Sequence, residues 1–201
     1  MGIGRKPIYD AVAALGQNLD EVARARRRPI DSSLAAVDAN NFRPIVLLDK
    51  DIDLPAAARL AVRALSRNRK GYFLMIEWDA HTTDPQRGLD NVVGFDKLIR
   101  ELASTVDLKD TLLLFTADHS FELRSVGGRR GDPLLRGLDE WRQNPRSKEV
   151  VEIPALRVGR SHTGEEVVAA AQGPGAGQVR GFLSNTQLFR VMMNAYGWKP
   201  E

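Results

Sequence analysis

Three short polar segments contain every histidine of the chain. They are MIEWDAHTTD at 75–84, TADHS at 116–120 and HTGEE at 162–166, with His81, His119 and His162. Neutral imidazoles and ionised carboxylates are donors that zinc and similar divalent cations accept from proteins. A lone histidine is more often a structural or surface residue, but three of three in such clusters favour a metal site.

The first two segments follow apolar runs that predict buried strands. These runs are GYFLMIE at 71–77 and TLLLFTAD at 111–118. Between them, from Leu89 onwards, apolar residues recur at helical spacing, which predicts a helix with one buried face. Two such strands joined by a helix predict a βαβ unit with parallel strands and a right-handed crossover.

Both predicted strands end in side chains that could do chemistry. Glu77, Asp79 and His81 follow the first, and Asp118 and His119 follow the second. The carboxyl ends of parallel strands meet at one edge of a sheet, where ligands of such folds bind. We therefore expect these two segments to lie together.

The rest of the chain also alternates helical and extended patterns. We expect Asp53 to cap the helix that follows it, with Pro55 in the first turn. The other expected elements are a helical pattern at 7–26, a short apolar strand or buried loop at 43–49, strands within 150–158 and 165–177, and a capped amphipathic helix at 184–198. Leu188, Val191, Met192 and Ala195 lie on one face of this last helix.

Size and composition predict one domain over residues 1–201. The chain is 43% hydrophobic and 27% charged, as expected for a globular protein that buries one sizeable core. Residues 123–149 are rich in glycine, arginine and proline and are expected to form a surface insertion.

Charge and hydropathy bear on the partners. The net charge is only +3 and acids alternate with bases, so we expect no nucleic-acid partner. The basic run ARARRRP at 23–29 is the one exception, and its ordinary interpretation is a solvated helix end terminated by Pro29. No apolar run is long enough to span a membrane, and residues 1–12 lack the apolar core of a signal peptide. Without cysteine, thiolate chemistry is excluded.

The order of these motifs resembles a known family. A Glu-Asp-His segment, then TADH, then HTG, then NTQLF before a final YGW resembles the C-terminal half of alkaline phosphatases. The resemblance runs over nearly the whole chain. It implies an α/β fold, incomplete here, with a largely parallel sheet flanked by helices.

The resemblance also implies roles for individual residues. Glu77 matches the family's magnesium ligand, and Asp118 and His119 match the pair that holds the zinc ion activating the nucleophile. His162 matches a histidine of the second zinc ion, which stabilises the leaving oxygen.

The remaining ligands of the second zinc ion come from the first polar segment. Asp79 and His81 keep the family's order of acid and then histidine, although their spacing from the preceding glutamate is shorter than in the family. Asp84 is the alternative carboxylate.

The implied activity is phosphomonoester hydrolysis through a covalent phosphoserine, with two zinc ions and one magnesium ion as cofactors. The substrate would be a phosphate monoester, and a homodimer is compatible with the resemblance. Family members are commonly periplasmic or extracellular.

The family's serine nucleophile has no matching position here. The pair Asp31 and Ser32, followed by Ser33, lacks the family's strand-to-helix setting, so we expect a fragment that is inactive without a further segment. Two alternatives remain open: a catalytically dead zinc-binding protein, and a related enzyme acting on phosphodiesters or sulfates.

Overall fold

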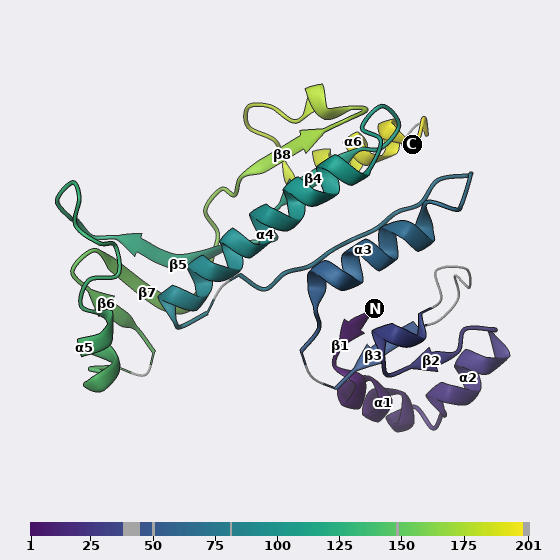
Figure 1. Ribbon diagram of the computed structural model, residues 1–201, viewed down its shortest axis with the longest axis horizontal. Helices are drawn as coiled ribbons and strands as arrows, with labels where there is room; N and C mark the ends of the chain where they lie inside the picture. The colour runs from purple at the N-terminus through teal and green to yellow at the C-terminus, as the bar shows by residue number, and fades with distance from the viewer. Residues whose placement is uncertain (38–44, 50, 81, 148, 199–201) are drawn as a thin grey trace. The chain divides into compact units, whose positions relative to one another are not determined.

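The protein is described here by a computed structural model, which places residues 1–37, 45–49, 51–80, 82–147 and 149–198. The chain forms two compact units, Met1–Trp78 and Asp79–Glu201. Figure 1 labels the α-helices and strands of both units, and each unit is described by itself.

The first unit contains a small parallel sheet and helices. β3 lies at the centre of the sheet, with β1 on one side and β2 on the other, and both neighbours run parallel to it. Val46 and Leu47 of β3 are buried, which confirms the apolar strand expected at 43–49. The elements are β1 (Gly2–Ile3), α1 (Arg5–Ala14), α2 (Leu19–Ala25), β2 (Ile30–Asp31), the 3-10 helix η1 (Leu34–Ala36), β3 (Ile45–Leu48) and α3 (Leu54–Leu65).

The helical pattern at 7–26 is divided between two helices. After α1, Gly16 adopts a positive φ of 71°, a backbone conformation that glycine reaches without steric cost. The Asn18 side chain then accepts hydrogen bonds from the N–H groups of Asp20 and Glu21 and so starts α2.

The basic run at 23–29 forms the end of α2, as its ordinary interpretation predicts. The helix stops before Pro29, however, because Arg27 takes a left-handed φ of 53°. The N–H groups of Arg27 and Arg28 then bond to the carbonyls of Arg24 and Ala23. This pairing satisfies carbonyls that the helix end would otherwise leave without partners.

Helix α3 begins as expected. The Asp53 carboxylate accepts a hydrogen bond from the N–H of Ala56 at 2.9 Å, and Pro55 lies in the first turn. One face of α3 is buried through small side chains, including Ala57, Ala61 and Val62.

The predicted strand at 71–77 is wrong in this structure. The described residues 71–80 lie in no helix or strand, and no ladder of the described residues includes them. Their burial nevertheless alternates, with Phe73 and Met75 exposed and Leu74 and Ile76 half-buried, so the segment keeps the period of two of an extended chain.

The second unit contains the long helix α4, whose helical spacing was predicted from Leu89 onwards. It buries Leu98 and Leu102, and Phe95 meets Phe115 of β4 edge-on at 5.9 Å between ring centroids. The elements are α4 (Pro85–Thr105), β4 (Leu113–Thr116), β5 (Ser120–Ser125), α5 (Leu138–Gln143), β6 (Val151–Ile153), β7 (Leu156–Thr163), β8 (Ala169–Gln172), the 3-10 helix η2 (Ala176–Gln178) and α6 (Asn185–Ala195).

Both described sheets of the second unit are antiparallel. β4 pairs with β8, and β7 lies between β5 and β6. The strands expected at 111–118, 150–158 and 165–177 are therefore present, but β4 has no parallel partner in the described chain and the predicted βαβ unit is not formed there. Mixed helices and sheets remain compatible with an α/β class, while the largely parallel sheet holds for the first unit only.

The segment 123–149 begins on the surface and returns to a core. Residues 123–134 are exposed, whereas Leu138 of α5 is buried in a cluster with Val151, Ile153, Leu156 and Val158. The expected helix at 184–198 is α6, which follows Ser184 and buries Val191. No helix of the described residues is long and apolar enough to cross a membrane.

Candidate metal centre

The connection from β4 to β5 carries two of the candidate ligands. β4 ends at Thr116 and β5 begins at Ser120, so Asp118 and His119 occupy a short turn between two strands. Connections of this kind often carry binding residues on a rigid scaffold of strands.

The β5–β7 ladder brings His162 to this turn. Ser120 pairs with Thr163 and Phe121 with His162, so the end of β7 lies beside the start of β5. The imidazole rings of His119 and His162 stack with their centroids 3.9 Å apart and an interplanar angle of 18°. Two histidines 43 positions apart in sequence thus meet through antiparallel pairing.

Hydrogen bonding orients the first of these rings. Nδ1 of His119 lies 2.8 Å from the carbonyl oxygen of Ser120, and Nε2 lies 3.5 Å from Oδ2 of Asp118. A proton on Nδ1 would donate to this carbonyl and leave Nε2 as the nitrogen able to bind a metal, as is common among metal-binding histidines. The Asp118 side chain is 85% exposed, against 26% for His119, so the carboxylate lies on the solvent side of the ring.

The donor set of this cluster suits zinc. Asp118 offers carboxylate oxygen, and His119 and His162 offer imidazole nitrogen. Within the described part of the chain, no three histidine or acidic side chains gather closely enough to hold a metal ion.

Glu165 lies near the same strand pair and was not singled out from the sequence. Hydrogen bonds from the Thr163 hydroxyl, from its own backbone N–H and from the Ser120 hydroxyl hold the pKa of its carboxyl below the ordinary value. Its place in the motif HTGEE, directly after HTG, is the signal that could have pointed to it.

The first polar segment is only partly described. Glu77 belongs to the first unit and Asp79 to the second, and both are exposed at alternate positions of the extended segment. The side chain of Asn91 donates to the backbone carbonyl of Asp79. His81 lies outside the described residues.

Asp84 has a structural task at the start of α4. Its Oδ1 accepts hydrogen bonds from the N–H groups of Gln86 and Arg87, and its two oxygens bind one nitrogen of the Arg142 guanidinium at 3.0 and 2.9 Å. Partial burial raises the pKa of Asp84, but the Arg87 N–H and the Arg142 guanidinium together lower it more, so it lies below its ordinary value.

The Asp-Ser pair of the first unit has a setting that differs from expectation. Asp31 ends the short strand β2, and the 3-10 helix η1 follows, so a strand does lead into a helical turn. The Asp31 carboxylate accepts from the N–H of Ser33, whose hydroxyl accepts from the N–H of Ala35. Ser32 is exposed.

Comparison with known proteins decides the family. The sequence profile of the family described as "Alkaline phosphatase" matches residues 47–152, which is more than half of the chain. The chain belongs to the alkaline phosphatase family. The matched range includes the Glu77 segment, Asp118 and His119, and it ends before His162.

Curated alkaline phosphatases agree at modest identity. An alkaline phosphatase of Escherichia coli K12 is 30% identical over 148 residues, covering 69% of this chain and 31% of that protein. Alkaline phosphatase 4 of Bacillus subtilis is 25% identical over 204 residues, covering 72% of this chain and 44% of that protein. Alkaline phosphatase H of Pseudomonas aeruginosa is 27% identical over 158 residues, covering 71% of this chain and 32% of that protein. This family member therefore spans less than half the length of each of these relatives.

Proposed function

We propose that this chain supplies the metal-binding part of a phosphomonoester hydrolase of the alkaline phosphatase type. The observation that carries the proposal is the stacking of His119 on His162 at the start of the β5–β7 ladder, with the Asp118 carboxylate beside His119. Membership of the family supports the same chemistry.

The residues of the second unit have defined roles in this proposal. Asp118 and His119 hold one zinc ion, with the Ser120 carbonyl fixing the ring of His119. His162 belongs to a second zinc ion, together with Asp79 and His81. Asp79 is preferred to Asp84 because the Asp84 carboxylate already caps α4 and binds Arg142.

Glu77 is proposed as the magnesium ligand, since carboxylate oxygen is the donor that magnesium prefers. When bound, zinc would activate the attacking oxygen and neutralise the leaving oxygen of a phosphate ester. The proposed substrate is a phosphate monoester, and the proposed functional assembly is a homodimer. Hydrolysis needs a nucleophile, and we assign none within this chain.

Metal analysis tests the proposal directly. The purified chain, loaded with zinc and desalted, should retain zinc, and His162→Ala and Asp118→Asn should each lose about one equivalent because each removes a ligand from a site with few donors. Glu140→Gln, an exposed acid of α5, is the matched control and should retain the wild-type content. Unchanged zinc in both His162→Ala and Asp118→Asn would overturn the metal assignment.

Hydrolysis assays then separate the alternatives. Retention of only one zinc equivalent, without release of nitrophenol from its phosphate monoester, identifies a catalytically dead zinc-binding protein, whereas the proposed phosphatase part retains two. Release from the bis-nitrophenyl diester or from the sulfate ester identifies the related enzymes. If the monoester is hydrolysed, Ser32→Ala should show whether the Asp-Ser pair supplies the nucleophile.

A further inference from the structure

A basic pocket lies in the second unit, in the connection from β5 to α5. Its volume is about 450 Å³, and it is lined by Gly128, Arg129, Asp132, Arg136 and Pro154. None of these residues belongs to the candidate metal centre. The pocket volume lies within the range of roughly 300–1,000 Å³ that is usual for sites binding small molecules.

Both ends of this connection are anchored to the hairpin of β6 and β7. At the first end, the N–H of Val126 donates to the carbonyl of Ala155 at 3.0 Å. At the other end, Gly137 has a φ of 87°, and a Cβ at this position would lie 3.2 Å from Cδ of Pro154. The close approach of Gly137 to Pro154 holds one wall of the pocket in place.

Local turns hold the arginine-bearing wall. The N–H of Asp132 donates to the carbonyl of Arg129 at 3.0 Å, and the N–H of Arg136 donates to that of Pro133 at 3.1 Å. These turns bring Arg129 and Arg136 to the same pocket although they lie seven residues apart.

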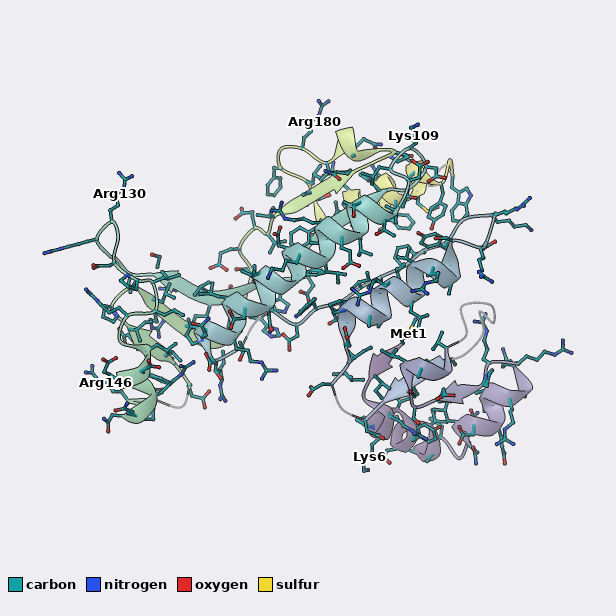
Figure 2. The ribbon with its side chains drawn as sticks, viewed as in Figure 1. Met1, Lys6, Lys109, Arg130, Arg146 and Arg180 are labelled. Atoms are coloured by element: carbon teal, nitrogen blue, oxygen red, sulfur yellow. The ribbon has the colours of Figure 1, made fainter. Side chains whose placement is uncertain are left out.

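The charge of the pocket is positive and only partly compensated. Residues 126–137 contain three arginines and one acid, Asp132. The Asp132 carboxylate lies 3.3 Å from the Arg136 guanidinium, in an ion pair that remains open to water. Arg129 is exposed, and Arg130 of the same loop points away from the ribbon (Figure 2).

We propose that this pocket binds a small molecule carrying phosphate groups. A guanidinium presents several N–H donors in one plane, which matches the oxygens of phosphate, and two guanidinium groups can bind two sides of one group or two linked groups. The site requires no metal and is therefore independent of the function proposed above.

Calorimetric titration of the full chain with inorganic pyrophosphate tests this site. EDTA in the buffer keeps the metal centre empty, and low salt preserves electrostatic attraction. We expect saturable binding near one equivalent. The double variant Arg129→Gln with Arg136→Gln should weaken the affinity for pyrophosphate by at least about tenfold, because charge-assisted hydrogen bonds are lost.

Two single variants sharpen the result. Arg130→Gln removes the same charge from the same loop without touching the pocket lining, and it should change the affinity less than about threefold, because its guanidinium donates no hydrogen bond into the pocket. Asp132→Asn removes the acid that competes for Arg136, and it should tighten binding severalfold.

Three outcomes would overturn the proposal. They are no binding of pyrophosphate at low salt, equal weakening by Arg130→Gln and by the double variant at Arg129 and Arg136, and weaker binding after Asp132→Asn. Tighter binding of a DNA duplex than of pyrophosphate at equal phosphate concentration would overturn the small-molecule class.

Discussion

At the scale of single residues, His119 is held by its nearest neighbours in sequence. The Ser120 carbonyl contacts Nδ1 and the Asp118 carboxylate approaches Nε2. Such local contacts can be anticipated from the tripeptide Asp-His-Ser. The stacking of the His162 ring on His119 depends on β5 lying beside β7, which the tripeptide does not contain.

Asp84 shows how a residue with suitable chemistry can serve the fold instead. Its type and its position near His81 made it an alternative zinc ligand, but its oxygens cap α4 and bind Arg142, which lies 58 residues away in sequence. A helix cap can be predicted from an aspartate before Pro85 at the start of a helical pattern. The ion pair could not be predicted, because Arg142 comes from a different helix.

Two replacements of Asp84 should distinguish the contribution of the helix cap to stability from that of the ion pair. Asp84→Ala removes both and should lower the free energy of unfolding by about 1 kcal/mol or more, as is typical of a lost cap. Asp84→Asn keeps a capping side chain and should cause a smaller loss, because the partner guanidinium is exposed to water. Urea denaturation measures the free energy of unfolding of both variants.

The same ion pair predicts that the stability of the fold depends on pH. The pKa of Asp84 is lower in the folded protein than its ordinary value, so its contribution to stability is full above that value and is lost as the carboxylate becomes protonated. The difference between wild type and Asp84→Asn should therefore be full near neutral pH and fade on acidification below about pH 4. A difference that grows on acidification would contradict this account.

At the scale of elements, the pairing of β4 with β8 depends on close approach just beyond the ladder. Gly173 follows β8 with a φ of 96°, and a Cβ there would lie 2.1 Å from the backbone oxygen of Thr111. Such contact with backbone cannot be relieved by rotating a side chain. Glycine is therefore needed at this position for both its conformation and its size.

Gly173→Ala should lower the free energy of unfolding by about 2–3 kcal/mol, from backbone strain and steric overlap. The matched control is Gly177→Ala in η2, where φ is not positive and no heavy atom lies within 4 Å of the added Cβ. Thermal unfolding of both variants gives the comparison. Equal melting temperatures would show that the Thr111 contact carries no such cost.

Elements whose signals are local were predicted well. The Asp53 cap of α3 and the bond from the N–H of Ser184 to Oε1 of Gln187 at the start of α6 both join residues three apart in sequence. The direction of β4 was predicted wrongly because a run of apolar residues has no directional information of its own. β4 pairs antiparallel with β8, more than 50 residues later.

At the scale of the whole molecule, the extended segment 71–80 exposes large apolar side chains. Phe73 is 62% and Met75 74% exposed, on a backbone that no described ladder includes. Extended chain with exposed apolar residues tends to pair with other chains. We therefore expect this segment to promote self-association.

Phe73→Lys combined with Met75→Lys should reduce self-association, because charges on an extended edge oppose pairing between chains. Light scattering coupled to size-exclusion chromatography, over a range of protein concentrations, measures the effect. Ile76→Lys is the contrasting variant and should lower stability instead, because its side chain is half-buried. If the wild type associates and the double variant gives the same mass distribution, this segment does not mediate contact between copies.

The sequence by itself determined the polar motifs, the helix caps and the positions of most helices and strands. These features depend on hydrogen bonds and side-chain spacing within a few residues, so short stretches of sequence encode them. Asp118 and His119 could be placed together in this way, and so could the cap at Asp53.

Only the tertiary structure decided which segments meet. It stacked His162 on His119, joined Arg142 to Asp84, left 71–80 outside the described ladders and placed Arg129 and Arg136 around one pocket. Most of these contacts join residues tens of positions apart, whereas the pocket arginines share a site through local turns in a loop that the β6–β7 hairpin anchors. Their formation depends on strand register and on the packing of several elements at once, which no short stretch of sequence specifies.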